Sequence, residues 1–60
     1  MNENLPKNPL ILLSYINLNL RDHYSSLDAL CDDLDIDKDE LVKTLREAGF
    51  EYSEEQNRFW

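Results

Sequence analysis

The feature that most constrains the fold of this chain is a change in the spacing of its apolar residues at Gly49. Before it, residues 26–48 carry apolar side chains three and four positions apart, with a break at residues 35–37, which predicts two short helices. After it, residues 50–60 alternate around a turn, as the two strands of a β-hairpin do. Two consecutive helices followed by a hairpin predict a helix-turn-helix or truncated winged-helix arrangement.

Local signals set the ends of these elements. Asn8 is a good N-cap before Pro9, Asp37 with Glu40 resembles a capping box, and Gly49 suits the left-handed residue after a helix. We therefore expect an extended arm over residues 1–7, helices over residues 8–22, 26–34 and 37–48, and a hairpin over residues 50–60. Either Ser25 or Ser26 can cap the second helix, and Asn57 is the candidate for positive φ in the turn.

Length and charge limit the classes of function. Sixty residues permit one domain, and a net charge of −7 disfavours binding to nucleic-acid phosphates or anionic lipid. The single cysteine excludes an internal disulfide and a cysteine zinc cluster, which favours a reducing cytoplasm. The sequence shows neither a signal peptide nor a run of about 20 apolar residues that would span a membrane. We expect a single mainly α domain in the cytoplasm.

The first expected helix carries two apolar stripes on different sides, with Asn17 among the polar residues between them. The first stripe consists of Leu12, Leu13, Ile16 and Leu20, and the second of Ile11, Tyr15 and Leu18. The second stripe either lies beneath the hairpin, with Trp60 covering it, or forms an exposed patch. A contiguous exposed apolar patch usually marks an interface, so Ile11, Tyr15, Leu18 and Trp60 are the candidate protein interface.

The sequence offers little for catalysis, cofactors or metal binding. Its only histidine, His23, lies near the end of the first helix, and Cys31 lies on the apolar face of the second, where a thiol is usually a small buried hydrophobe. Aspartates at positions 33, 35 and 37 imitate half of a calcium-binding loop, but Lys38 and Thr44 stand where glycine and glutamate are needed. We expect no enzyme, no cofactor, no metal site and no small-molecule substrate.

The third expected helix is the alternative site, for DNA. Lys38, Lys43 and Arg46 can contact phosphates, but four carboxylates between residues 37 and 47 oppose them. The sequence therefore predicts a protein–protein interaction module, either a homodimer or a small acidic adaptor. Weak or partner-assisted DNA binding is the alternative.

One further set of residues points to a family. It consists of Leu5-Pro6, Pro9, Leu12-Leu13-Ser14, Asn17, Leu20-Arg21-Asp22, Tyr24, Ser26-Leu27-Asp28-Ala29-Leu30-Cys31-Asp32-Asp33-Leu34-Asp35-Ile36, Glu40-Leu41, Tyr52, Asn57 and Phe59. In these residues the chain resembles a bacterial family of about this length, described only as a domain of unknown function. The resemblance implies a free-standing bacterial protein and brings no reaction, ligand or catalytic residue. Trp60 and residues 1–4 are the parts least tied to the family pattern.

Overall fold

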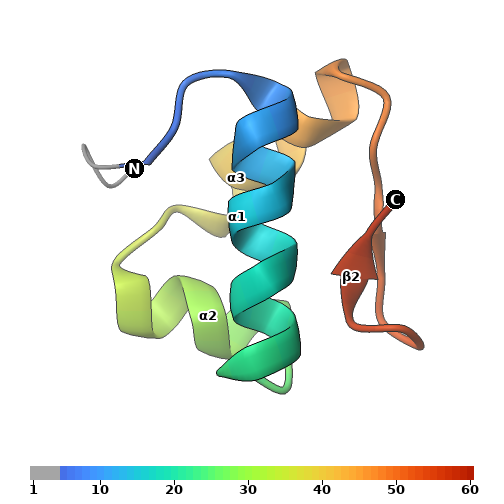
Figure 1. Ribbon diagram of the computed structural model, residues 1–60. Coiled ribbons are helices and arrows are strands. Elements are labelled where there is room, and N and C mark those ends of the chain that lie inside the picture. The colour runs from blue at the N-terminus through green and yellow to red at the C-terminus, as the bar shows by residue number, and fades with distance from the viewer. Residues whose placement is uncertain (1–4) are drawn as a thin grey trace.

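The computed structural model describes residues 5–60 as three helices followed by a short antiparallel hairpin (Figure 1). The elements are α1 (Pro9–Asp22), α2 (Leu27–Leu34), α3 (Lys38–Glu47), β1 (Tyr52–Ser53) and β2 (Arg58–Phe59). The mainly α fold with a C-terminal hairpin is thus confirmed, while the likeness to a winged helix stays a prediction. Residues 1–4 of the expected arm lie outside the described residues. Leu5, in the same arm, is buried in the core.

The expected caps begin all three helices. The side chain of Asn8 accepts hydrogen bonds from the backbone N–H groups of Leu10 and Ile11, at 2.9 and 3.3 Å. Ser26, rather than Ser25, caps α2, because its Oγ accepts from the backbone N–H of Ala29. Asp37 caps α3 by accepting from the backbone N–H of Glu40. These bonds satisfy N–H groups that have no partner within their own helix.

Helix α3 ends as the glycine predicts. Gly49 has φ 95°, the backbone N–H of Phe50 donates to the carbonyl of Leu45, and that of Gly49 donates to the carbonyl of Arg46. This pair of bonds is a Schellman motif. It reverses the chain and directs it into β1. Ala48, which a simple 3.6-residue period places on the buried face of α3, is exposed because it belongs to this turn.

Helix α2 ends in a way that the sequence did not predict. Asp35 adopts a left-handed conformation, with φ 55° and ψ 49°, and the backbone N–H of Ile36 donates to the carbonyl of Cys31. A residue with a Cβ atom is strained in this region, although aspartate tolerates it better than most. The turn between α2 and α3 is therefore held in a strained conformation at one residue.

We expect Asp35→Gly to raise the free energy of unfolding by about 0.5 kcal/mol, because glycine adopts positive φ without strain. A matched control is Asp32→Gly inside the exposed part of α2, which should lower it by about 1 kcal/mol. Urea denaturation of the two variants measures both effects. Equal losses of stability would contradict the strain at Asp35.

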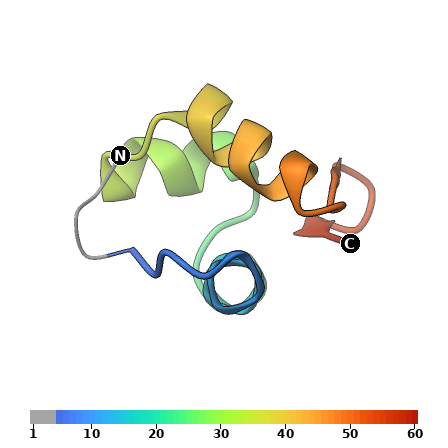
Figure 2. The same cartoon turned by 90° about the horizontal axis from the view of Figure 1, so that it is seen from above.

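Helix α1 lies in front of a layer formed by α2 and α3, and the hairpin lies beside it (Figures 1 and 2). Figure 2 looks down the axis of α1 and shows the segment before the helix on one flank and the hairpin on the other. The side of α1 that faces away from α2 and α3 is left uncovered. The core between the layers consists of Leu5, Leu12, Ile16, Leu20, Leu27, Leu30, Cys31, Ile36, Leu41, Leu45 and Phe59.

The two strands pair Tyr52 with Phe59 and Ser53 with Arg58. Beyond them, Glu51 and Trp60 exchange both backbone hydrogen bonds, each 3.0 Å long. Phe59 is the one hairpin side chain in the buried core, and its ring lies 5.4 Å from that of Tyr52. No helix among residues 5–60 is both long enough and apolar enough to cross a membrane.

Candidate interaction surface

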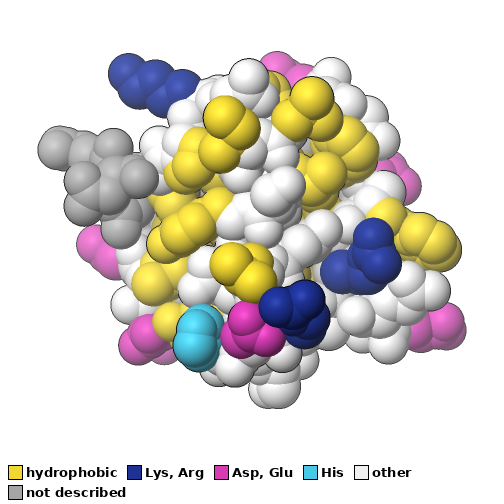
Figure 3. All heavy atoms as spheres, viewed as in Figure 1, with side chains coloured by type: hydrophobic (Ala, Val, Ile, Leu, Met, Phe, Trp, Pro, Cys, Tyr) yellow, Lys and Arg dark blue, Asp and Glu magenta, His cyan; other side chains and the backbone are white. Residues whose placement is uncertain are grey.

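Three apolar side chains of α1 lie exposed on the side away from the core. Ile11 is 58% exposed, Leu18 50% and Tyr15 39%, and we call these three residues the outer face of α1. Figure 3 shows hydrophobic side chains gathered along the front of the molecule, where Figure 1 places this helix. The alternative in which the hairpin covers this stripe is therefore wrong. The stripe is an exposed patch.

The hairpin leaves the outer face free because it contacts a different side of α1. The side chain of Asn17 receives a hydrogen bond from the backbone N–H of Phe59 at 2.7 Å and donates one to the carbonyl of Phe59 at 2.9 Å. At about 100° per residue, the outer face lies roughly 100° to 160° around the helix from Asn17. The polar spacer between the two apolar stripes is thus the attachment point of β2.

Trp60, the fourth residue of the candidate interface, lies on the hairpin and not on α1. It is 62% exposed at the end of the hairpin, and the guanidinium of Arg58 lies 5.9 Å from the centre of its ring. Leu10, which the stripe pattern leaves out, is also 62% exposed. The signal for it was the uninterrupted apolar run from Leu10 to Leu13, which is too wide for one buried stripe. Leu10 therefore enlarges the apolar surface of α1.

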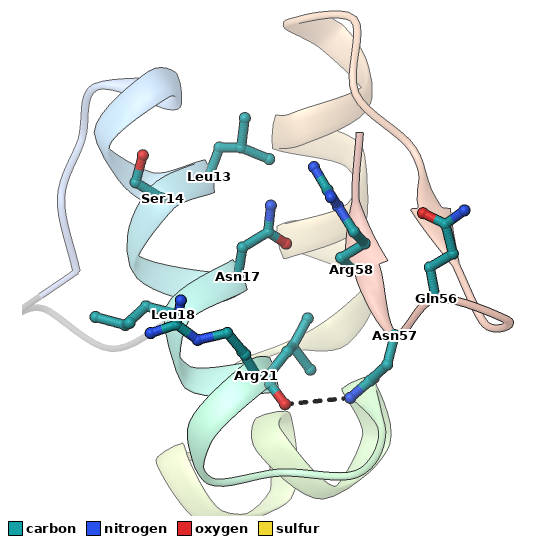
Figure 4. A pocket seen from close by; sticks show the side chains of 9 residues that line it. Leu13, Ser14, Asn17, Leu18, Arg21, Gln56, Asn57 and Arg58 are labelled. Atoms are coloured by element: carbon teal, nitrogen blue, oxygen red, sulfur yellow. Dashed lines mark hydrogen bonds between the residues drawn. The ribbon is translucent and has the colours of Figure 1, made fainter.

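A hollow of about 690 Å³ lies between α1 and the hairpin, next to the outer face. It is lined by Leu13, Ser14, Asn17, Leu18, Leu20, Arg21, Gln56, Asn57 and Arg58 (Figure 4). Its lining contains no carboxylate, although the chain as a whole is strongly acidic. Figure 4 shows the side chain of Arg58 between the hairpin and α1, while that of Arg21 extends away from the hairpin past Leu18. The two guanidinium groups therefore do not converge on one ligand position.

Asn57 holds the hairpin turn, which forms one wall of this hollow, against the end of α1. Its φ is 51°, and its side-chain amide donates to the carbonyls of Leu20 and Tyr24, at 3.2 and 2.9 Å. Its side-chain oxygen accepts a 2.6 Å hydrogen bond from the hydroxyl of Tyr52. The same hydroxyl accepts from the backbone N–H of Leu27, at the start of α2. One side chain thus ties the hairpin turn to the end of α1 and, through Tyr52, to α2.

Charge is unevenly distributed over the molecule. α1 has only two charged residues, Arg21 and Asp22, and they pair through two hydrogen bonds of 3.0 and 3.3 Å. The bond from Arg21 holds the pKa of Asp22 below its ordinary value. Eleven of the thirteen acidic residues lie within residues 28–55, on α2, α3, the turn between them and the hairpin. The outer face is therefore a neutral apolar surface on an acidic protein.

The acidic residues that imitate a calcium loop have separate structural roles. Asp33 accepts a hydrogen bond from the hydroxyl of Tyr24, which raises the pKa of that tyrosine, so Asp33 is not merely a solvated side chain. Asp35 occupies the left-handed end of α2, and Asp37 caps α3. Within residues 5–60 no three histidine, cysteine or acidic side chains come close enough to hold a metal ion.

Cys31 is buried in the core, and burial raises the pKa of its thiol above the ordinary value. The thiolate form is therefore disfavoured, and a thiolate is what a nucleophilic cysteine needs. His23 forms the C-cap of α1 with its backbone N–H, which donates to the carbonyl of Asn19. Cys31 thus lies in the core on α2, whereas His23 lies at the end of α1.

Comparison with known proteins identifies the domain. The family described as Domain of unknown function (DUF4250) matches residues 6–59. The chain belongs to this family. No curated protein and no solved structure matches the chain significantly.

The DUF4250 match extends from the segment before α1 to the end of β2, so it contains the whole outer face and all the residues that line the hollow. Trp60 lies outside it. The resemblance to a domain of unknown function is thereby confirmed.

Proposed function

We propose that this protein is a protein–protein interaction module whose binding surface is the outer face of α1. The observation that carries the proposal is the exposure of Ile11, Tyr15 and Leu18 together on the uncovered side of one helix. Burying an exposed apolar side chain contributes roughly 1.5–3 kcal/mol when burial is complete, so three of them can support a specific contact. The partner is either a second copy of the chain or another protein to which this chain is an adaptor.

Two features of α1 suit this function. The helix is fixed on the rest of the fold by its opposite side, where Leu12, Ile16 and Leu20 are almost completely buried. The outer face is therefore presented on a rigid element, which lowers the entropic cost of binding. Tyrosine is also enriched in the parts of interfaces that contribute most of the binding energy. The single free cysteine favours a reducing cytoplasm as the setting.

We expect Tyr15→Glu to weaken association at least 10-fold while leaving the monomer folded. A carboxylate in the middle of the outer face would have to be desolvated on binding, whereas in the monomer it stays in water. The measurements are sedimentation equilibrium for self-association and affinity capture for a foreign partner, each beside circular dichroism of the helices.

The matched control is Ala29→Glu, which adds the same charge to an exposed position of α2. It lies at the third residue of that helix, where a carboxylate is favourable, and it should leave association unchanged. Equal effects of the two substitutions would show that net charge, and not the outer face, controls binding. Loss of the helical signal in Tyr15→Glu would show that Tyr15 supports the fold.

DNA binding through α3 is the second candidate, and the charges around α3 weigh against it. Lys38, one of the three cations of that helix, forms a 2.7 Å ion pair with Asp28. Each phosphate contact depends on a cation that is free to replace counterions, and this pair occupies one of them. Retention of the protein on duplex DNA at about 100 mM salt would favour this alternative over the interaction module.

A further inference from the structure

We infer that the occupant of the outer face is a second copy of this chain, bound with its α1 antiparallel to the first. This inference rests on the proposed function and names its partner. The two-fold axis of the dimer passes close to Ser14 and Tyr15. Ile11 of each copy then packs against Leu18 of the other.

The spacing of the outer residues is symmetric about that point. Ile11, Ser14, Tyr15, Leu18 and Asp22 lie within an arc about 100° wide. Under a two-fold rotation that reverses the helix, position 11 exchanges with 18 and position 14 with 15. Large apolar residues thus meet large apolar residues, and the small side chain of Ser14 faces Tyr15. A self-complementary patch of this kind is what a two-fold interface requires.

The distribution of charge also favours a second copy over a foreign protein, whether that protein is basic or acidic. The outer face itself contains no charged side chain with which to attract a basic or an acidic partner. A basic partner would be drawn to residues 28–55, where most of the acidic side chains lie. Two outer faces, in contrast, can meet while the acidic α2 and α3 stay on the outside of the dimer, since both lie behind α1 (Figure 2).

The ends of α1 set the direction. Lys7 is exposed just before the helix and Asp22 is exposed at its last residue. Their midpoint along the chain is the same as that of Ile11 and Leu18, so an antiparallel pair brings Lys7 of each copy near Asp22 of the other. In an antiparallel pair the positive N-terminal end of each helix also lies beside the negative C-terminal end of the other, which is favourable. A parallel pair would instead bring the two Lys7 side chains together at one end and the two Arg21–Asp22 pairs together at the other.

The area available makes this a weak dimer. A standard interface removes about 800 Å² from each partner, and one exposed face of a 14-residue helix supplies less than that. We therefore expect a dissociation constant between about 10 μM and 1 mM. Self-association should be readily reversible and should increase when the concentration of the protein is raised through this range.

Disulfide trapping tests the arrangement. Ile11→Cys and Leu18→Cys are prepared separately in the full chain and oxidised slowly in a glutathione buffer, alone and mixed in equal amounts. An antiparallel dimer places position 11 opposite position 18, while two copies of position 11 are about seven residues, or roughly 10 Å, apart along the helix. We expect several-fold more crosslinked dimer in the mixture than in either variant alone. The unmodified chain, whose Cys31 is buried, is the control and should give none.

The possible results of these experiments distinguish a failure of the antiparallel dimer from a failure of the interaction module. Crosslinking of each variant with itself, and no gain on mixing, would mean a parallel dimer and would overturn the antiparallel arrangement. A strict monomer at about 1 mM in sedimentation equilibrium would overturn self-association altogether. If such a monomer still bound a foreign protein in a way that Tyr15→Glu abolished and Ala29→Glu did not, the interaction module would stand with a different partner. If neither kind of binding occurred, both would fail.

Discussion

Replacement of Asn57 by alanine is expected to lower the free energy of unfolding by about 3–4 kcal/mol, since three side-chain hydrogen bonds are lost at about 1 kcal/mol each and alanine is strained at positive φ. For a domain of this size, that corresponds to a fall in melting temperature of roughly 25–30 °C. Thermal and urea denaturation followed by circular dichroism measure the change. A small domain has little stability in reserve, so part of the population should already be unfolded at 25 °C.

The reason for so large an effect is that Asn57 satisfies groups on three elements. Without its amide, the carbonyls of Leu20 and Tyr24 lose the donor that joins them to the hairpin. Without its oxygen, the hydroxyl of Tyr52 loses the acceptor that orients it toward the backbone N–H of Leu27. All these contacts are partly buried, where an unsatisfied polar group costs more than it does in water.

Two further substitutions separate the loss of hydrogen bonds from the strain at positive φ. Asn57→Gly keeps a residue that adopts positive φ and loses the hydrogen bonds, so it should be about 1 kcal/mol less damaging than alanine. Asn57→Asp keeps the acceptor for Tyr52 but presents a carboxylate to the carbonyls of Leu20 and Tyr24, so it should be destabilised mainly through α1. A loss of less than about 1 kcal/mol in Asn57→Ala would contradict the network described for this residue.

The parts of the fold that could be predicted are those that depend on neighbours in sequence. A cap such as Asn8 or Asp37 bonds to a backbone N–H two or three residues away, so the sequence alone contains both partners. Gly49 is recognisable for the same reason, since the Schellman motif is closed within six residues, from Leu45 to Phe50. The left-handed Asp35 was missed because aspartate is a weaker marker of that conformation than glycine is.

The parts that could not be predicted depend on pairs far apart in the chain. Asn17 bonds to Phe59 across 42 residues, and nothing in the sequence distinguishes it from a solvated asparagine between two apolar stripes. This contact decides on which side of α1 the hairpin lies, and so whether Ile11, Tyr15 and Leu18 are covered or exposed. The candidate interface was therefore identifiable as a stripe, but its exposure required the structure.

We expect Asn17→Ala to cost about 2–3 kcal/mol, because both hydrogen bonds between its side chain and the backbone of Phe59 are lost in a partly buried site. The effect should be concentrated in the hairpin. The amide of Asn17 acts as an additional strand partner for β2, and a two-stranded hairpin is only marginally stable without such support. Loss of this contact should loosen Phe59 from the core, and with it the wall of the hollow beside α1.

Hydrogen exchange followed by NMR separates this local effect from general destabilisation. In Asn17→Ala, the backbone N–H groups of Phe59 and Trp60 should exchange much faster than those of α2 and α3, which do not depend on the contact directly. Asn19→Ala is the matched control, because the amide of Asn19 donates only to the carbonyl of Tyr15 within the same helix. It should leave the hairpin protected. Uniform acceleration across all elements in Asn17→Ala would mean that the hairpin and the helices unfold as one unit, and that Asn17 supports the whole fold rather than the position of β2.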